Sequence, residues 1–510
     1  METTVVESHG LEDLVFGVVA PIGTDLNSVS FAMSNTLRGM GYDTNVIQLS
    51  SLLTEVKDRF QLTLESSPEE KRYETYMTAG NAFREAMRRG DALSMLAVGA
   101  IGALRSKFVQ KKRAFILRSL KHPDEVKSLR NIYGPAFVLF SINSSRTTRV
   151  ENLAKKFNKS HGGFVSADYR SVAENLINRD QQETGVPMGQ NVRRVFSMAD
   201  FFVDADSGLA SAVKRMIELF MGNVFTTPTR DEYNMFFAHA AAARSASLQR
   251  QVGAVISSLD GNVISVGTNE VPKPGGGLYW EGDESDSRDF RHGGEINDDM
   301  KHRMFVDVIQ RVKNSGMNYD KGHDLHGEND PGKIANWLLQ NKHMENARIT
   351  SIIEFGRCVH AEMAAIMDAA RRGVAVNDST LYSTTFPCHE CARHIVAAGI
   401  RCVHYIEPYP KSLVNELYPD SIQIEGDAVG RHVQFVPFVG VAPRRYLDVF
   451  KLRDADRKTL LKHASNWDST VASPQLGEYP KRTQLINLVT EKIAFDQFRS
   501  ELKEYRHGDD

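Results

Sequence analysis

The chain has 510 residues, of which 41% are hydrophobic and 25% charged, a composition typical of a soluble globular protein with about two to four domains. A net charge of -2 argues against a large basic nucleic-acid surface, and four cysteines leave no disulfide framework. The opening residues METTVVESHG carry no secretion signal, and the longest weakly polar stretch, residues 92–104, is too short to span a bilayer. We therefore expect a cytoplasmic protein without a membrane partner.

Strand and helix signals alternate through the first 220 residues. Residues 14–20 (LVFGVVA) predict a buried strand, which is followed by a turn at 21–24 and a helix at 27–40. A helix opens at Pro123. Further strands are expected at residues 44–49, 114–117, 136–142 and 201–204. This order predicts a doubly wound α/β domain, which we place at residues 1–222.

A second domain is expected at residues 231–445, after a stretch in which Pro and Thr interrupt the periodicity. An Ala-rich helix at 231–247 precedes two strands at 251–258 and 262–268, which Asp260-Gly261 joins as a hairpin. Later strands at 380–384 and 402–406 extend this hairpin into a mixed sheet within an α-β-α domain. Residues 272–355 interrupt the domain as a polar insertion with its own helix near 300–313, and residues 446–510 are predicted to be a C-terminal helical extension.

The most informative motif is His360-Ala361-Glu362, followed by Pro387-Cys388-His389-Glu390-Cys391. Residues 363–372 are rich in helix formers and end at Gly373, so His360 and Glu362 fall in the first turn of a helix. Cys388 and Cys391 are one helical turn apart, directly after Pro387. Two helix N-termini are therefore predicted to meet at one point.

One His, two Cys and a Glu that is not a ligand form the signature of zinc-dependent nucleobase deaminases. Three protein ligands leave the fourth zinc position open for water, as catalytic zinc sites require. We therefore expect Zn²⁺ to be bound by His360, Cys388 and Cys391, with Glu362 as the group that moves protons.

Three other interpretations of these residues exist. Cys358 offers a fourth ligand that would close the site, although the motif is complete without it. The CxxC pair alone would also suit a redox site or, together with Cys402 and His404, a zinc knuckle. A redox pair, however, expects no H-x-E motif upstream.

The similarity to zinc-dependent deaminases extends beyond the zinc motif. Residues 251–255 (QVGAV), the segment Gly267-Thr268-Asn269-Glu270 and Leu381-Tyr382 before Pro387 resemble the deoxycytidylate deaminase family. The resemblance covers residues 230–442 apart from the insertion, and it implies a cytidine-deaminase-like fold acting on dCMP or dCTP. It implies that Asn269 binds the deoxyribose or the base. Further substrate contacts are expected from three residues: Ala361, Thr384 and Pro387.

The first domain resembles P-loop nucleotide kinases. Residues 117–126 (LRSLKHPDEV) are similar to the strand-to-helix step of deoxynucleoside monophosphate kinases. The phosphate loop G-x-x-x-x-G-K-[ST] is degenerate, because Val18 replaces its first Gly and Thr24 its Lys when Gly23 is taken as the second Gly. Gly23 and Thr24 remain the candidates for nucleotide contact, and an ordinary strand-to-helix turn is the alternative. We expect this domain to restrain or sense rather than to transfer phosphate.

A kinase-like domain fused to a deaminase with an insertion and the segment 407–412 (EPYPKS) resembles bacterial anti-phage dCTP deaminases. The resemblance implies conversion of dCTP and dCMP to uracil nucleotides during infection and an inhibitory small RNA. We also expect a homo-oligomer and an allosteric nucleotide. The insertion would be a lid, an allosteric site or an oligomer contact.

Three other functions are compatible with parts of the sequence. A housekeeping dCMP deaminase that supplies thymidylate precursors shares the chemistry but needs no kinase-like domain. A nucleic-acid cytidine deaminase would need a basic, aromatic-lined groove, of which the sequence shows no sign. A nucleotide-sensing scaffold with a relict zinc site would not need Glu362.

Overall fold

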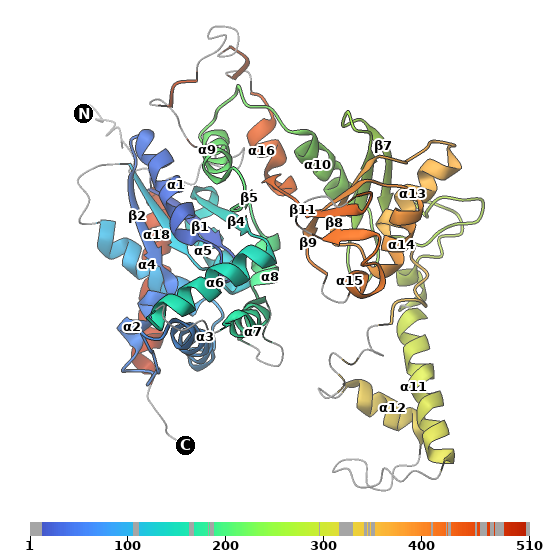
Figure 1. Ribbon diagram of the computed structural model, residues 1–510, viewed down its shortest axis with the longest axis horizontal. Coiled ribbons are helices and arrows are strands. Elements are labelled where there is room, and N and C mark those ends of the chain that lie inside the picture. Colours follow the sequence, from blue (N-terminus) through green and yellow to red (C-terminus); the bar gives the residue numbers. More distant parts are fainter. Residues whose placement is uncertain are drawn as a thin grey trace, which may run out of the picture. The chain divides into compact units, whose positions relative to one another are not determined.

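The computed structural model folds into two compact units, Met1–Phe236 with Pro437–Asp510, and Phe237–Val436 (Figure 1). The residues that the structure describes are 13–105, 112–162, 168–181, 183, 188–294, 296–315, 330–340, 344, 347, 352–409, 412–424, 426, 430–453, 456–458, 467–469, 474 and 484–505. None of the described helices is long and apolar enough to cross a bilayer.

The first unit is built on a six-stranded sheet with the strand order β12-β5-β4-β1-β3-β2. Neighbouring strands pair in parallel except β12, which runs antiparallel to β5. The strands are β1 (Asp13–Val19), β2 (Asp43–Gln48), β3 (Arg113–Arg118), β4 (Phe137–Asn143), β5 (Phe201–Asp204) and β12 (Gly440–Val441).

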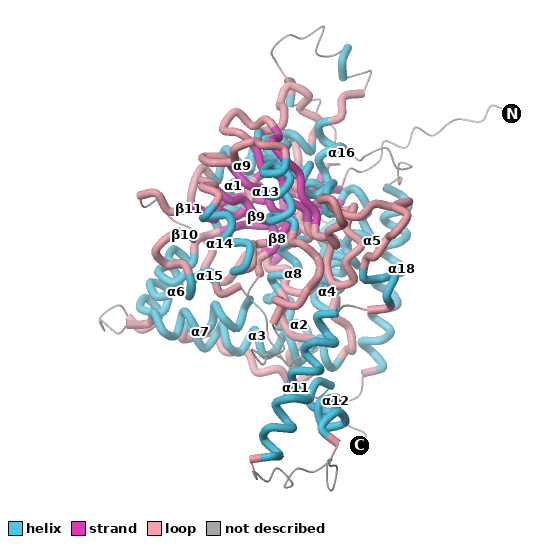
Figure 2. The backbone as a smooth tube through the Cα atoms, turned by 90° about the vertical axis from the view of Figure 1, so that its right-hand side faces the viewer, coloured by secondary structure: helices cyan, strands magenta, loops and turns pink. Residues whose placement is uncertain are grey.

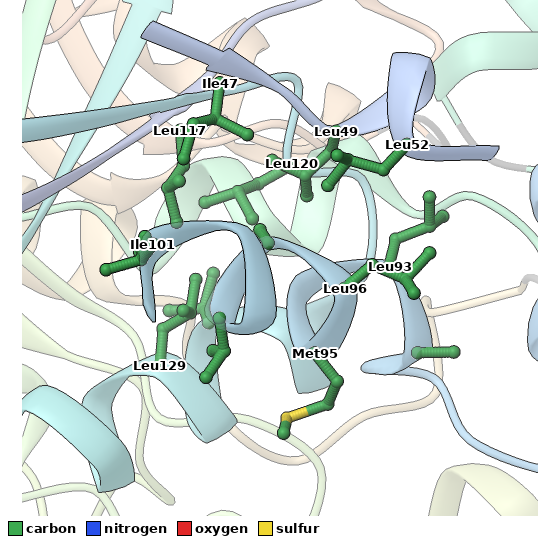
Figure 3. Packing of buried hydrophobic residues seen from close by; sticks show 14 of the residues in the cluster. Ile47, Leu49, Leu52, Leu93, Met95, Leu96, Ile101, Leu117, Leu120 and Leu129 are labelled. Carbon is green, nitrogen blue, oxygen red and sulfur yellow. The ribbon is translucent and has the colours of Figure 1, made fainter. Parts of the chain in front are cut away.

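Helices cover both faces of this sheet, because its central strands are apolar on both sides. On one face, Phe16 and Ile116 pack with α1 and α9, and on the other Val15 and Leu117 pack with α4 and α5. Figure 3 shows the second face, where Ile47 and Leu117 meet Ile101 of α4 and Leu129 of α5. The predicted doubly wound α/β fold is therefore confirmed. The helices are α1 (Leu26–Gly39), α2 (Leu53–Val56), α3 (Glu69–Ala86), α4 (Ala92–Arg105), α5 (Pro123–Tyr133), α6 (Arg146–Ser160), α7 (Arg170–Gln181), α8 (Val192–Ser197) and α9 (Leu209–Phe220).

The C-terminal part of the chain returns to the first unit and is not a separate extension. Helix α18 (Gln484–Glu504) packs against α4 and α5, and Figure 1 shows it in red among the blue N-terminal elements. Phe498 is buried in the core, and the ring of Phe495 lies over Gly99 of α4, where a Cβ would be 2.3 Å from it. The short helix α16 (Tyr446–Phe450) belongs to the same unit. Apolar burial thus ties β12, α16 and α18 to the first unit.

The second unit contains the predicted mixed sheet, with the strand order β10-β11-β9-β8-β6-β7. The expected hairpin forms, and β8 continues it antiparallel to β6 and parallel to β9. The strands are β6 (Gly253–Ser257), β7 (Val263–Thr268), β8 (Thr380–Thr385), β9 (Cys402–Glu407), β10 (Ile422–Ile424) and β11 (Val433–Pro437). The helices outside the insertion are α10 (Arg230–Ala242), whose first residues belong to the first unit, α13 (Ala361–Arg371), α14 (His389–Ala397) and α15 (Val414–Leu417).

The described residues of the insertion form two α-helices, whereas the sequence predicts one helix near 300–313. Helix α11 (Ile296–Asn314) and helix α12 (Pro331–Gln340) lie side by side (Figure 2). Phe305 and Ile309 of α11 bury Ile334 and Ala335 of α12 in a small core of their own.

Helix α13 lies directly on the sheet because Gly267 of β7 has no side chain. A Cβ at Gly267 would lie 2.0 Å from the carbonyl oxygen of Ala361 and 2.5 Å from the backbone nitrogen of Ala365. The N-terminus of α13, which carries the zinc motif, is thereby held at a fixed height above β7.

Candidate active site

The first two residues of the candidate zinc site occupy equivalent positions in two helices. His360 is the N-cap of α13 and Cys388 is the N-cap of α14, and both have extended backbone angles. The Sγ atom of Cys388 accepts a bond from the backbone N–H of Cys391 at 3.4 Å, so it takes the place of an ordinary capping oxygen. The predicted convergence of two helix N-termini is thus present.

The three predicted ligand atoms lie within reach of one cation. His360 Nδ1 is 3.2 Å from Cys388 Sγ and 3.4 Å from Cys391 Sγ. These three side chains form a group whose donor atoms all lie within 4.8 Å of one another. One imidazole nitrogen and two sulfurs are a donor set that suits zinc, and three protein ligands leave one position of a tetrahedral site open. The residues therefore fit the zinc cofactor.

Glu362 lies beside this group and is not part of it. Its carboxylate is buried, with Oε2 3.4 Å from Cys391 Sγ and Oε1 accepting a long bond of 3.5 Å from Ser383 Oγ. Burial raises the pKa of Glu362, and the negative charge of Cys388 acts in the same direction.

Electrostatics within the group favour a thiolate at Cys388. Hydrogen bonding from Cys391, together with the contact to His360, lowers the pKa of Cys388 to about 4. The same contact with Cys388 raises the pKa of His360 to about 9. Burial raises the pKa of the Cys391 thiol. Without a metal the group therefore pairs a thiolate at Cys388 with a protonated His360, and metal binding would release the protons held by His360 and Cys391.

The two other cysteines lie outside the group. Cys358 Sγ is 3.7 Å from Asp289 Oδ2, a residue of the insertion. Cys402 Sγ is 3.6 Å from His404 Nε2 within β9, and the His404 ring stacks on Tyr382 at 5.2 Å. Neither pair joins the group formed by His360, Cys388 and Cys391. The geometry therefore does not assemble the zinc knuckle or the closed four-ligand site.

A cavity of about 160 Å³ opens beside the group, and its wall includes His360, Ala361, Glu362 and Cys388. Asn269, the predicted substrate contact, also lines it. The side chain of Asn269 is engaged, because Oδ1 accepts from Val252 N at 2.7 Å and Nδ2 donates to Arg250 O at 2.7 Å. Asn269 thus lines the cavity and also holds the backbone of residues 250–252 beside it.

Two of the expected substrate contacts do not line this cavity. Thr384 Oγ1 accepts from Gly253 N at 3.2 Å across the sheet, and Thr385 lines the cavity in its place. Successive residues of a strand point to opposite faces of the sheet. Thr384 and its neighbour Thr385 therefore face opposite sides, and Thr385 is the residue on the side of the cavity. Pro387 O accepts from Ser412 Oγ at 2.9 Å, and its neighbour Phe386 faces the cavity.

Sequence reasoning missed the contribution of residues before and after the zinc motif. Arg250 lies in the cavity wall and pairs with Glu407 at 2.9 Å. Arg357 also lies in the wall and pairs with Asp289 at 3.0 Å. Tyr409 was contained in the segment 407–412 but had no assigned role. Pro410 and Lys411 of that segment lie outside the described residues.

The candidates in the first unit occupy the turn after β1. Gly23 has φ +91, and a Cβ there would lie 2.6 Å from the carbonyl oxygen of Arg149, so the turn requires glycine. Thr24 is buried, and its Oγ1 donates to Pro21 O at 2.8 Å. Asp25, which follows the missing lysine position, is the N-cap of α1.

Residues 228–407 match the family model described as "Cytidine and deoxycytidylate deaminase zinc-binding region". ComE operon protein 2 of Bacillus subtilis (strain 168) is 42% identical over 53 residues, which are 10% of this chain and 28% of that protein. The deoxycytidylate deaminase of Enterobacteria phage T2 is 43% identical over 54 residues, which are 11% of this chain and 29% of that protein. The chain thus spans less than a third of either relative. The solved dCMP deaminase of cyanophage S-TIM5, in complex with dCMP and dUMP, shares 15% identity at a TM-score of 0.24 and covers 42% of this chain and 99% of its own.

Proposed function

We propose that this chain, whose residues 228–407 match the zinc-binding region of cytidine and deoxycytidylate deaminases, removes the amino group of deoxycytidine nucleotides by hydrolysis. The observation that carries the proposal is the position of Glu362. Its buried carboxylate lines the same cavity as His360 and Cys388 and lies 3.4 Å from Cys391 Sγ. A proton-transfer group is thus placed beside a metal-binding group and a space for a base.

The reaction adds water to C4 of cytosine and releases ammonia, so it needs a nucleophile and a carrier for protons. Zinc bound by His360, Cys388 and Cys391 would lower the pKa of water to about 7 and so supply hydroxide at neutral pH. Glu362 would take one proton of the water and pass it to the ring nitrogen. It would then take the second proton from the new C4 hydroxyl and give it to the amine, which leaves as ammonia as the C4=O bond forms. Ser383 Oγ, 3.5 Å from Glu362 Oε1, would hold the carboxylate in orientation.

The size of the cavity favours a nucleotide substrate of which only the base is enclosed. Its volume of about 160 Å³ is well below the ~300 Å³ at which pockets for whole drug-sized ligands begin. Two guanidinium groups lie in its wall, those of Arg250 and Arg357. Each is paired with a carboxylate, Glu407 at 2.9 Å and Asp289 at 3.0 Å, which a sugar phosphate would have to replace. The proposed substrates are dCMP and dCTP, converted to dUMP and dUTP.

Ammonia release from dCMP, dCTP, CMP, CTP and a cytosine oligonucleotide tests the proposal. The expected result is release from the two deoxynucleotides, with Glu362→Ala as the inactive control. Release from the oligonucleotide alone would instead support a nucleic-acid deaminase. Absence of release from all five substrates by zinc-loaded protein would contradict the proposal.

The proposed role is depletion of dCTP as an anti-phage defence, which rests on the resemblance to dual-domain dCTP deaminases. A housekeeping dCMP deaminase that supplies thymidylate precursors is the alternative, and the name of the phage T2 relative agrees with dCMP as the substrate without indicating either role. Activity on dCTP separates the two in vitro. In infected bacteria, dCTP should fall in cells that carry the wild-type chain and remain constant in cells that carry Glu362→Ala.

The proposal includes three partners: an inhibitory small RNA, which rests on that resemblance, and, separately from it, further copies of this chain and an allosteric nucleotide. Light scattering of the purified protein measures the number of copies. Extraction and sequencing of RNA that copurifies with it tests the small RNA. A monomer without RNA would remove the first two partners from the proposal.

A further inference from the structure

The two arginines in the wall of the cavity beside the zinc-binding group have carboxylate partners that are placed differently. Arg250 pairs with Glu407 at 2.9 Å, and Arg357 pairs with Asp289 at 3.0 Å. Of the two carboxylates, Asp289 lines the cavity and Glu407 does not. The two ion pairs therefore present different conditions to a ligand that carries phosphate.

The pair of Arg250 and Glu407 can change partners at little cost. Their side chains are 50% and 40% exposed, so both ions stay hydrated, and an exposed ion pair contributes little to stability. The backbone at Arg250 is fixed independently of this pair, because its carbonyl oxygen accepts from Asn269 Nδ2 at 2.7 Å. A change of partner thus needs to move only the two charged side chains.

The pair of Arg357 and Asp289 cannot change partners in this way. The side chain of Asp289 is only 7% exposed, and both of its oxygens have a donor: Oδ1 accepts from Arg357 Nη1 at 3.0 Å and Oδ2 from Cys358 Sγ at 3.7 Å. Withdrawal of Arg357 would leave a buried carboxylate without its cation, which is strongly unfavourable. A phosphate beside Arg357 would also be repelled by Asp289, which lines the same cavity.

Arg357 instead stands at the start of the segment that leads to the predicted zinc ligand His360. One side of this segment is held by Glu270, because Glu270 N donates to Val359 O at 3.2 Å and Val359 N donates to Glu270 O at 3.0 Å. The other side is held by Asp289, a residue of the insertion. The insertion thus helps to fix the chain that carries His360.

We infer that Arg250 alone binds the phosphate of the substrate, after Glu407 has released it, and that Arg357 is a positioning residue that Asp289 holds in place. This inference rests on the proposed deamination of deoxycytidine nucleotides and assigns its specificity. A phosphate group carries about −1.5 to −2 charges and accepts two parallel bonds from a guanidinium, so it displaces the single charge of Glu407. Deoxycytidine carries no phosphate, so Arg250 favours the nucleotides over the nucleoside.

Calorimetric titration of the full chain with dCMP, dCTP and deoxycytidine tests this inference, in a Glu362→Ala background so that no ligand is consumed. Arg250→Ala should weaken the binding of both nucleotides at least tenfold and keep that of deoxycytidine within twofold. Glu407→Gln removes the competing charge and should tighten the binding of the nucleotides alone. Arg311→Ala, which breaks an exposed ion pair with Asp307 on α11, is the matched control and should keep all three ligands within twofold.

The variants of the other pair should give a different pattern. Arg357→Ala and Asp289→Asn should weaken the binding of all three ligands by the same factor, because both disturb the segment before His360. Arg357→Lys, which can still pair with Asp289, should restore most of that loss. Arg250 and Glu407 are half-exposed, so their variants report on the site even if Arg357→Ala does not fold.

The outcomes separate this inference from the proposed function. A loss confined to the nucleotides in Arg357→Ala would overturn the inference and leave the proposed deamination intact. Unchanged nucleotide binding in Arg250→Ala, or an equal loss for deoxycytidine in that variant, would overturn it as well. If none of the three ligands binds and the wild-type chain releases no ammonia, the proposed function is wrong and the inference falls with it.

Discussion

His360 and Cys388 begin two different helices, and their side chains meet, with Nδ1 and Sγ 3.2 Å apart. Each residue is an N-cap, so the positive ends of both helix dipoles point to the same place. That field stabilises the thiolate of Cys388 before any metal is bound. The site is therefore organised by backbone as much as by side chains.

We expect one zinc ion per chain, lost in Cys388→Ala and in Cys391→Ala, because each substitution removes one of three ligands. Elemental analysis by mass spectrometry measures the occupancy. Cys358→Ala and Cys402→Ala are the controls and should keep their zinc, since both sulfurs lie outside the group. Full occupancy in Cys388→Ala would show that the assignment is wrong.

Glu362→Gln should keep zinc and fold but lose turnover by at least about 10²–10⁴-fold, the usual value of one positioned proton-transfer group. Steady-state ammonia release and zinc content, measured on the same sample, check this. Glu354→Gln is the matched control, because Glu354 is an exposed carboxylate outside the cavity wall. A rate within tenfold of wild type would mean that another acid moves the protons.

Asn269→Ala should raise KM and lower the stability of the second unit, because two backbone partners at 2.7 Å lose their bonds. Leaving buried polar groups unpaired costs about 1–3 kcal/mol each. Urea unfolding and Michaelis–Menten kinetics measure the two effects separately. Unchanged KM and kcat would leave Asn269 with a role in the turn alone.

Gly267→Ala should destabilise the second unit by about 1–3 kcal/mol or more, as overpacking does. The added Cβ would lie 2.0 Å from the carbonyl oxygen of Ala361, so α13 has to move and His360 with it. Zinc occupancy should fall together with the free energy of unfolding. Gly294→Ala, which meets nothing within 4 Å, is the control.

The first unit should not transfer phosphate. Thr24 stands at the loop lysine position and Asp25 fills the helix end with a carboxylate, whereas phosphoryl transfer depends on positioning and charge neutralisation. Incubation with ATP and each deoxynucleoside monophosphate, followed by chromatography, should yield no diphosphate. If diphosphate does form, and Lys121→Ala or Arg118→Ala abolishes it, that cation replaces the missing loop lysine.

Local sequence patterns predicted the parts of the site that depend on neighbouring residues. The helix expected at 363–372 is α13 (Ala361–Arg371), and Gly373 follows it with φ +69. The convergence of His360, Cys388 and Cys391 followed from their positions at helix starts. These features need only helix propensity, capping and a metal-ligand spacing.

Features that depend on distant residues were not predictable in the same way. The register of β8, which turns Thr385 rather than Thr384 to the cavity, is set by pairing with β6 and β9. The contact between Cys358 and Asp289 joins residues 69 positions apart. The sequence also contains no local pattern that indicates the return of the C-terminal segment to the first sheet, because β12 has only two residues.

The path of the chain, which leaves the first unit at Phe236 and re-enters it at Pro437, sets an order of events during synthesis. Translation completes the second unit before β12 and α18 exist, so until then the edge of β5 is unpaired and the surfaces of α4 and α5 that pack against α18 are uncovered. A stop codon near residue 440 would therefore harm the N-terminal half of the protein. Conversely, a protease cut in the insertion should leave both halves of the first unit held together by their shared core.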